Sequence, residues 1–377
     1  MSKYLSIVRR SVFYNLIGLY LLSPIWQSAV AETIITIGKG SGIVWEGMPF
    51  TATNKSPTTT PNFPNPDLIA YYSVAYILPT ALGVGGCVPD TYLTTIAGYK
   101  VYKIAPGVGI IPRATVSANY VLNDNTVEML SGTIGLPATQ ATTTSGAVIT
   151  NPLQGTTWCL APRMSSSTNF YKASTYINAT VTGTWVMIAD GSQTRKDNIS
   201  LSNVNFTTAG NGYVDFSPIF SNNMTLRIST LECNVSTNQT IDFGAVSRNT
   251  KQDAELGSLS YPLTVQCSQD NSVGVDANIN VQFRALSSLY EGTKTRLALS
   301  EGGGYITGEI NNVTGSGRCS DGTGVPFDNS PLKIASIINT QASQNTTNQV
   351  TWRLCSGGSS LPIGNVTASA EMLVTFN

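Results

Sequence analysis

The C-terminal segment that begins at Gly364 constrains the fold more than any other part of the chain. From Val366 onward, apolar residues alternate with mostly polar ones. The apolar positions are Val366, Ala368, Ala370, Met372, Val374 and Phe376, and the intervening ones are Thr367, Ser369, Glu371, Leu373, Thr375 and Asn377. A repeat of two is the period of a β-strand, so one face of this strand is apolar. Because chain ends fray unless they are tied down, another element must hold this strand.

The rest of the chain also has the pattern of β-structure. Residues 275–286 place Ala277, Ile279, Val281, Phe283 and Ala285 on one face and polar side chains on the other. Residues 263–267 and 350–354 alternate in the same way, and glycine-rich turns at 190–192, 301–304 and 321–324 separate such runs. Many short strands between turns predict an all-β protein built of antiparallel sandwiches, with little helix.

Three stretches of the N-terminal half fit this pattern less well. Residues 51–66 contain four prolines, and residues 137–152 are rich in Thr, Ala and Ser. We expect loops in both, because neither can easily form a central strand. Residues 67–78 are compatible with either a buried strand or a short helix.

Residues 1–31 have the organisation of a cleavable signal peptide. Basic residues at Lys3, Arg9 and Arg10 precede a short apolar run, and Ala29-Val30-Ala31 follows it. A membrane anchor is the alternative, but the apolar run is too short to span a bilayer comfortably. We therefore expect an exported mature chain that begins at residue 32.

Charge and histidine content exclude several classes of function. Charged residues are 11% of the chain, the net charge is zero and no basic cluster stands out, so nucleic acid is not an expected partner. The chain has no histidine, which excludes Ser-His-Asp and Cys-His catalysis and histidine-ligated zinc. We expect no catalytic residues, no metal and no cofactor.

The chain has six cysteines: Cys87, Cys159, Cys233, Cys267, Cys319 and Cys355. An even count in an exported chain predicts three disulfides, and none of the cysteines forms the C-x-x-C pair of redox or zinc sites. Fifteen connectivities are available to six cysteines. The simplest is sequential: Cys87–Cys159, Cys233–Cys267 and Cys319–Cys355.

A domain boundary is expected near residues 218–223, which gives domains 32–220 and 221–377. The second domain has Cys233 in its first strand, then Ile241-Asp242-Phe243-Gly244-Ala245-Val246, then Leu263-Thr264-Val265-Gln266-Cys267. Gly364 is fourteenth from the end and Phe376 is penultimate. These elements resemble the pilin domain of chaperone–usher fimbriae, in which the penultimate residue is usually Tyr.

The resemblance implies a fold and a mode of assembly. The pilin domain is an incomplete immunoglobulin-like sandwich that lacks its last strand. A periplasmic chaperone lends a strand first, an outer-membrane usher receives the subunit, and an adjacent pilus subunit then donates its own strand. The residues expected at this groove are Gly364, Val366, Ala368, Ala370, Met372, Val374, Phe376 and Asn377, and basic chaperone residues would bind the Asn377 carboxylate.

A large domain stands where a pilin would carry its donor strand, so the chain resembles a fimbrial tip adhesin. The resemblance implies a location at the fimbrial tip and a lectin-like N-terminal domain that binds a host surface glycan or glycoprotein. Sugar sites combine aromatic faces with amides and carboxylates on loops. The candidates are Asn123, Asp124 and Asn125, which also fit a hairpin turn, and Trp185, which also fits a core position. Other aromatic candidates are Trp45, Tyr92, Tyr99, Tyr102, Tyr120, Trp158, Tyr171 and Tyr176.

Three alternatives stay open. The chain could be a minor structural tip pilin without receptor binding. It could be an exported glycan hydrolase whose acid/base pair comes from Asp90, Asp124 or Glu128. The sequons at Asn178, Asn198 and Asn234 would also fit an immunoglobulin-like glycoprotein of a eukaryotic cell surface.

Overall fold

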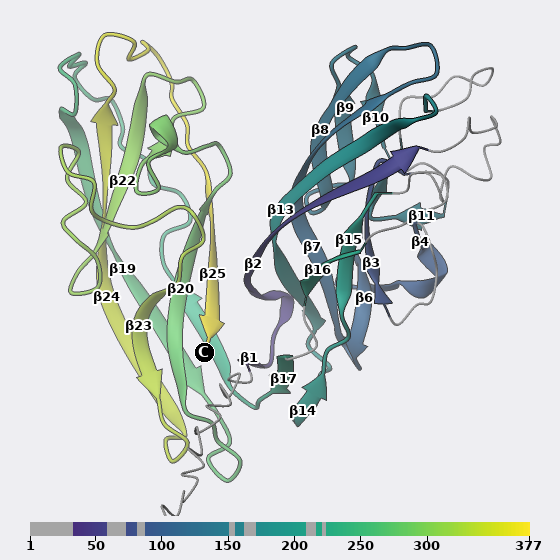
Figure 1. The fold of residues 1–377 in the computed structure, drawn as a ribbon. Coiled ribbons are helices and arrows are strands. Elements are labelled where there is room, and N and C mark those ends of the chain that lie inside the picture. Colours follow the sequence, from purple (N-terminus) through teal and green to yellow (C-terminus); the bar gives the residue numbers. More distant parts are fainter. Residues whose placement is uncertain are drawn as a thin grey trace, which may run out of the picture. The chain divides into compact units, whose positions relative to one another are not determined.

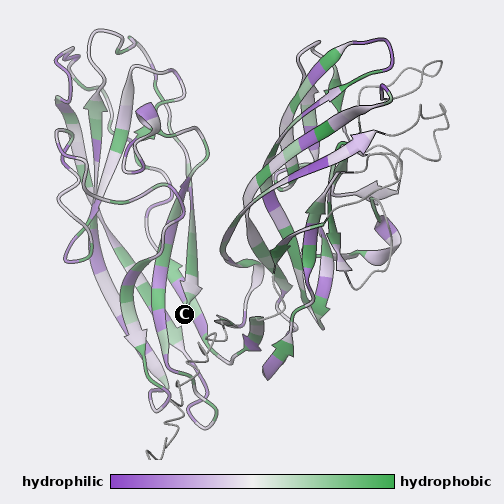
Figure 2. Cartoon of the chain, viewed as in Figure 1, coloured by the Kyte–Doolittle hydropathy of each residue, from purple (hydrophilic) through white to green (hydrophobic). Residues whose placement is uncertain are grey.

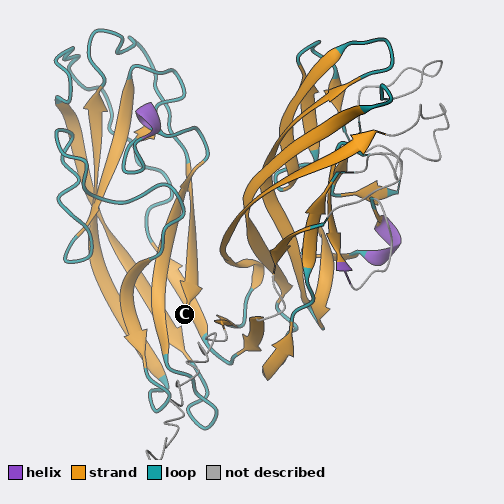
Figure 3. Ribbon diagram, in the orientation of Figure 1, coloured by secondary structure: helices purple, strands orange, loops and turns teal. Residues whose placement is uncertain are grey.

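The computed structural model describes residues 33–58, 73–80, 87–150, 155–161, 171–208, 216–220 and 224–377. The expected signal peptide lies outside these residues, as do residues 67–72 of the ambiguous stretch 67–78; the described half of that stretch enters a strand, β3 (Ala75–Pro79), and not a helix. In the described part, β-strands dominate and helical structure is limited to short 3-10 turns such as η3 (Asp90–Tyr92) and η4 (Tyr290–Gly292) (Figure 3). No helix there is long and apolar enough to cross a membrane. The all-β prediction is therefore confirmed.

The largest sheet has eight strands and comes from the N-terminal half. Its main path runs β10-β9-β8-β7-β13-β2, and β6 and β5 branch from β7. In Figure 1, β13 lies between β2 and β7, in agreement with the pairing. The bounds are β2 (Ser41–Thr58), β5 (Thr94–Ile96), β6 (Tyr99–Ala105), β7 (Val108–Val121), β8 (Val127–Gly135), β9 (Gln140–Thr143), β10 (Val148–Ile149) and β13 (Thr175–Asp190).

A four-stranded sheet, β12-β3-β15-β16, packs on one face of this large sheet. The ring of Trp185 on β13 lies 5.3 Å from that of Phe220 on β16 and 5.5 Å from that of Phe50 on β2. The opposite face of the large sheet bears the exposed hydroxyl and amide side chains. The bounds are β3 (Ala75–Pro79), β12 (Cys159–Leu160), β15 (Val204–Thr207) and β16 (Ser217–Phe220), and β4 (Val88–Pro89) pairs separately with β11 (Thr156–Thr157).

The C-terminal half forms a second pair of packed sheets. One is the five-stranded sheet β18-β19-β24-β22-β21. The other consists of β25, β20 and β23, with β20 in the middle. The ring of Phe283 on β20 lies 5.7 Å from that of Trp352 on β24, which joins the two layers. The bounds are β18 (Glu232–Ser236), β19 (Glu255–Ser268), β20 (Ala277–Ala285), β21 (Leu297–Ala298), β22 (Gly304–Ile310), β23 (Leu332–Ile337), β24 (Ser343–Ser356) and β25 (Ala370–Phe376).

Strand β1 (Thr33–Ile37) belongs to the same hydrogen-bonded sheet as β25. It runs parallel to β17 (Met224–Ile228), which pairs in turn with β14 (Lys196–Ser200). Its register with β25 is limited to one position, Thr36 opposite Phe376. The six-stranded order β14-β17-β1-β25-β20-β23 therefore combines strands from both halves of the sequence.

The buried apolar residues form two large clusters. The first extends from Ile35 to Ile228 along the sequence and the second from Leu231 to Phe376. Hydrophobic and hydrophilic residues are interspersed along the strands in Figure 2, as expected for strands that face a core on one side. Leu226 and Ile228 on β17 belong to the first cluster, although the sequence pattern favoured placing them in the C-terminal domain.

The three disulfides follow the sequential pairing. Cys87 is bonded to Cys159, Cys233 to Cys267, and Cys319 to Cys355. Cys233 and Cys267 face each other across β18 and β19. The third disulfide ties the connection that follows β22 to the end of β24.

Two of the expected loops contain strands. Residues 51–58 continue β2, and residues 137–152 contain β9 and β10. The loop predictions for these residues were wrong, and residues 59–66 lie outside the described part of the chain. The expectation that the first stretch forms no central strand holds for residues 51–58, because β2 is one end of the sheet path, whereas β9 pairs on both sides, with β8 and β10. Pro57 is tolerated in β2 because an edge strand needs hydrogen bonds on one side only.

Candidate functional site

The outer edge of β25 is the first candidate site. The N–H of Asn278 donates to Asn377 O at 2.8 Å, and Leu286 N–H donates to Ser369 O at 2.8 Å. This register turns the backbone groups of the odd-numbered residues of β25 toward β20. The backbone groups of Ala370, Met372 and Val374 therefore face away from β20, because successive residues of a strand alternate in direction. Among the described residues, β1 pairs with this edge only at Phe376.

Apolar side chains beside this edge are only partly covered. Met372 and Val374 are half-buried, whereas Phe376, at the end that β1 reaches, is 7% exposed. Val235 on β18, the outer strand of the facing sheet, is also half-buried and packs on the same core. Partly covered apolar side chains of one core thus lie on both β18 and β25.

The C-terminal strand is shorter than the sequence predicted. Val366 and Ala368 precede β25, so the continuous strand from residue 366 was wrong. The reason lies at Thr367, whose N–H donates to the Glu301 carboxylate at 2.7 Å and whose carbonyl accepts from Ser300 N–H at 2.8 Å. The bond from the Thr367 N–H, supported by the Glu301 N–H and the Thr367 hydroxyl, lowers the pKa of Glu301. Gly364, with φ +109°, begins this stretch in a conformation that favours glycine.

The other face of β20 and β25 is polar and meets strands β2 and β7 through an ion-pair cluster. The Glu46 carboxylate, 1% exposed, lies 3.4 Å from Arg113 Nη2 and 2.8 Å from Arg284 Nη2. Both arginines also contact Glu371 on β25. Burial lowers the pKa of Arg284, but hydrogen bonds and charge from Glu46 and Glu371 outweigh it and raise that pKa. We define Glu46, Arg113, Arg284 and Glu371 as the ion-pair cluster.

Some of the aromatic candidates for receptor binding are buried and others are exposed. Trp185 is fully buried, and its indole N–H donates to Ile219 O at 3.1 Å, so it is a core residue and not part of an exposed site. Trp158, Tyr120 and Tyr171 are also buried, whereas Tyr92 and Tyr176 are exposed. Burial, and to a smaller extent Tyr120, raises the pKa of Tyr171. A ring can stack on a ligand only where one face is open, which favours Tyr176 and Tyr92.

Asn123, Asp124 and Asn125 form the expected hairpin turn between β7 and β8. Asn125 has φ +70°, the left-handed conformation that asparagine tolerates in tight turns. The Asp124 carboxylate accepts the N–H of Thr126, and Asn125 Oδ1 accepts a bond from Lys172 Nζ at 2.6 Å. All three side chains are exposed at the tip.

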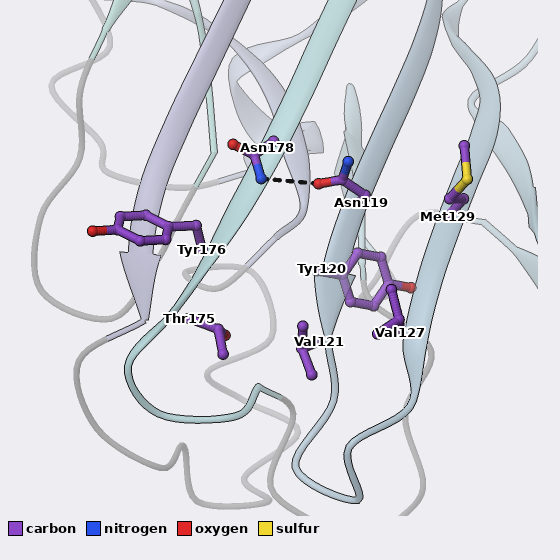
Figure 4. A pocket seen from close by; sticks show the side chains of 8 residues that line it. All are labelled: Asn119, Tyr120, Val121, Val127, Met129, Thr175, Tyr176 and Asn178. Atoms are coloured by element: carbon purple, nitrogen blue, oxygen red, sulfur yellow. Dashed lines mark hydrogen bonds between the residues drawn. The ribbon is translucent and has the colours of Figure 1, made fainter.

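A pocket of about 380 Å³ lies beside the base of this hairpin. It is formed on β7, β8 and β13, with Asn119 and Asn178 joined by a hydrogen bond of 2.9 Å (Figure 4). Sequence reasoning included Tyr120 and Tyr176 but missed most of the lining. The full lining is Asn119, Tyr120, Val121, Val127, Met129, Thr175, Tyr176 and Asn178. The signal that could have revealed it is the apolar pair Val127 and Met129 at outward-facing strand positions.

The carboxylates considered for glycan hydrolysis do not share an open site. Glu128 is fully buried and accepts bonds from Tyr120 Oη at 3.1 Å and Ser145 Oγ at 2.7 Å. Asp124 lies on the exposed turn, and Asp90 forms an ion pair with Lys100 at 3.8 Å. The described residues contain no group of three His, Cys, Asp or Glu side chains that could hold a metal ion.

Comparisons with known proteins gave structural matches only. No family model matches the chain, and no curated protein matches it. One solved structure that it resembles is the CsuC–CsuE chaperone–tip adhesion subunit pre-assembly complex of archaic chaperone–usher Csu pili of Acinetobacter baumannii. The match has 12% identity and a TM-score of 0.24, and covers 87% of this chain and 100% of the other.

Two further structures are similar to a comparable degree. A chaperone–tip adhesin complex of CFA/I fimbriae biogenesis matches with 11% identity and a TM-score of 0.23, over 91% of this chain and 95% of the other. The CupB6 tip adhesin from Pseudomonas aeruginosa matches with 14% identity and a TM-score of 0.29, over 89% and 87%. These superpositions are loose, so we infer function from the strands and surfaces of the chain itself.

Proposed function

We propose that this chain is a fimbrial tip adhesin of the chaperone–usher type. The observation that carries the proposal is the outer edge of β25. Its outward backbone groups at residues 370, 372 and 374 and its half-buried Met372 and Val374 offer both requirements for strand addition. Main-chain hydrogen bonds supply affinity in this mode of recognition, and alternate side chains supply specificity.

The proposed partners follow from this edge. A periplasmic chaperone supplies the first strand, the outer-membrane usher receives the complex, and an adjacent pilus subunit supplies the final strand. The pilin domain is then an incomplete immunoglobulin-like sandwich completed in trans. Residues 364–377 line the strand-addition site in this proposal, although β25 itself begins at Ala370.

The N-terminal region is the proposed receptor-binding domain, with a host surface glycan or glycoprotein as ligand. It has its own apolar cluster and places a large sheet where a pilin would carry a donor strand. Such a subunit accepts a strand but donates none, so it occupies the distal end of the fimbria at the bacterial surface. The burial of Glu128 and the ion pair of Asp90 with Lys100 support a binding protein over a hydrolase.

Assembly and receptor binding are tested separately. The full chain is co-expressed with a periplasmic fimbrial chaperone and its usher, and complexes are purified from the periplasm. We expect a stable complex with the chaperone, and normal accumulation without any chaperone would contradict the proposal. Full-length protein from that complex is then applied to host cells and a glycan array. A chain that forms the complex but binds neither would be a minor structural tip pilin.

A further inference from the structure

The pocket beside β7, β8 and β13 interrupts an otherwise uniform surface. Across five strands, the outward positions next to it carry a row of hydroxyls: Thr53, Thr180, Ser117, Ser131 and Thr142. The next outward-facing row across the sheet, two residues further along each strand, consists of Lys55 on β2, Asn178 on β13, Asn119 on β7 and Met129 on β8. The change from hydroxyls to amide, cationic and apolar side chains is therefore local to the pocket.

Apolar side chains in the pocket are unusually open to solvent. Val127 is 69% exposed, Met129 58% and Tyr176 50%. Tyr176 borders the hollow on one side of the Asn119–Asn178 pair, and Val127 and Met129 border it on the other (Figure 4). Exposed apolar groups around one hollow are typical of a ligand site rather than of scattered surface residues. Tyr176 supplies an aromatic face, and Val127 and Met129 supply contacts for a methyl group.

The two amides can bind a polar ligand. Asn178 Nδ2 donates to Asn119 Oδ1, which fixes the orientation of both side chains (Figure 4). Each amide has one carbonyl oxygen and two N–H donors. The Asn119 amide nitrogen and the Asn178 carbonyl oxygen have no further partner in the described part of the chain. They can therefore bind hydroxyl or amide groups of a sugar.

The charge around the pocket favours an anionic ligand. Lys55 Nζ lies 4.1 Å from the centroid of the Tyr176 ring, and Lys172 Nζ is bonded to Asn125 at the hairpin tip. Neither lysine forms an ion pair with the described residues. The neighbouring carboxylates are Asp124, at the tip of the hairpin, and Glu128, which points into the core. Among the described residues around the pocket, there are thus two lysines and one exposed carboxylate.

We propose that this pocket is the receptor site and binds a terminal sugar that carries both an acetamido group and a carboxylate, as sialic acids do. The acetamido methyl contacts Val127 and Met129, and the apolar side of the sugar stacks on Tyr176. The carboxylate pairs with Lys55, and the amides of Asn119 and Asn178 bind the remaining polar groups. The proposal rests on the adhesin function proposed above and specifies its ligand.

The test compares sialyllactose with lactose, using the full chain purified from the periplasm. Binding of α2,3- and α2,6-sialyllactose is titrated by ligand-observed NMR. We expect binding of at least one sialyllactose, at least about tenfold weaker binding of lactose, and affinity that falls as salt is added. Tyr176→Ala should weaken binding about tenfold or more, and Lys55→Gln about three- to tenfold with loss of the salt dependence.

Matched controls separate the site from general effects. Phe216→Ala removes an aromatic ring of similar exposure elsewhere, and Lys251→Gln removes an exposed lysine of the C-terminal half; both should bind as the wild type does. Equal affinity for lactose, or unchanged binding by Tyr176→Ala, would overturn the proposed site. If other glycans still bind on an array, the adhesin function survives; if no glycan and no host cell binds, that function fails as well.

Discussion

The two halves of the molecule differ in how far the edges of their sheets are protected against pairing with another strand. In the N-terminal sheet, one edge strand, β2, carries Lys55 and Pro57, and the other edge is formed by β9 and β10, of four and two residues. In the C-terminal half, β25 has seven residues without proline or lysine, and its outward backbone groups lie beside partly covered apolar side chains.

This difference is informative because bare strand edges promote aggregation. Charges, proline and very short strands are the usual protections, and the N-terminal sheet has all three. Residues 370–374 of β25 contain no proline, and the one charged side chain there, Glu371, is paired with Arg113 and Arg284. A protein that protects one set of edges and leaves another unprotected is expected to use the second set for pairing with another chain.

The largest expected effect comes from the buried end of β25. Phe376→Asp places a charge at a position that is 7% exposed, so we expect a loss of about 4 kcal/mol or more in the free energy of unfolding. The chain should be degraded in the periplasm, which immunoblotting of periplasmic extracts would detect. Ile363→Asp, at a site 88% exposed, is the control and should accumulate normally. Normal levels of both variants would contradict a structural role for β25.

Removing single disulfides tests whether the two halves are separate domains. The closed loops span 72 residues for Cys87–Cys159 and 36 for Cys319–Cys355, so each Cys-to-Ala double variant should lose about 4 kcal/mol of stability. We expect calorimetry to show that each variant lowers the midpoint temperature of one unfolding transition and leaves the midpoint of the other transition unchanged. A single transition that both variants shift equally would show that the halves unfold together.

The ion-pair cluster joins the two halves, and its removal should have a smaller effect. Glu46→Gln leaves Arg113 and Arg284, which are 19% and 18% exposed, to share Glu371. Because both arginines keep some contact with water, we expect a loss of about 2 kcal/mol, below the range for fully buried pairs. Urea denaturation measures it. Glu255→Gln, which removes a more exposed partner of Arg353, should change stability by less than about 0.5 kcal/mol; equal effects would refute the special role of Glu46.

The smallest expected effect is a pH dependence at the start of the C-terminal segment. The pKa of Glu301 is lower in the folded chain than in the unfolded one, chiefly through the N–H of Thr367. Its stabilising contribution is therefore present above the unfolded pKa and lost as the pH falls through the folded pKa. The protection factor of the Thr367 amide, which is its exchange rate relative to the intrinsic rate at the same pH, should therefore fall on acidification. In Glu301→Gln this protection should be low at every pH, and a wild-type protection factor that does not change with pH would contradict the role of Glu301.

Local patterns determined how much of the fold was predictable from sequence. Alternation identified β20 almost residue for residue, and the turn at Asn123–Asn125 followed from its composition. Proline content misled at residues 51–58, because an edge strand tolerates a residue that lacks an N–H. The pocket was mostly missed because its lining comes from β7, β8 and β13, and only their register brings Met129 beside Asn119 and Asn178.

Hydrogen exchange at the amides of Met372 and Val374 tests the central claim most directly. If β25 has an open outer edge, these amides should exchange rapidly in the isolated chain, while those of Leu373 and Thr375, which face β20, stay protected. Adding the chaperone should protect Met372 and Val374 as well. Protection of all four amides in the chain alone would contradict the account.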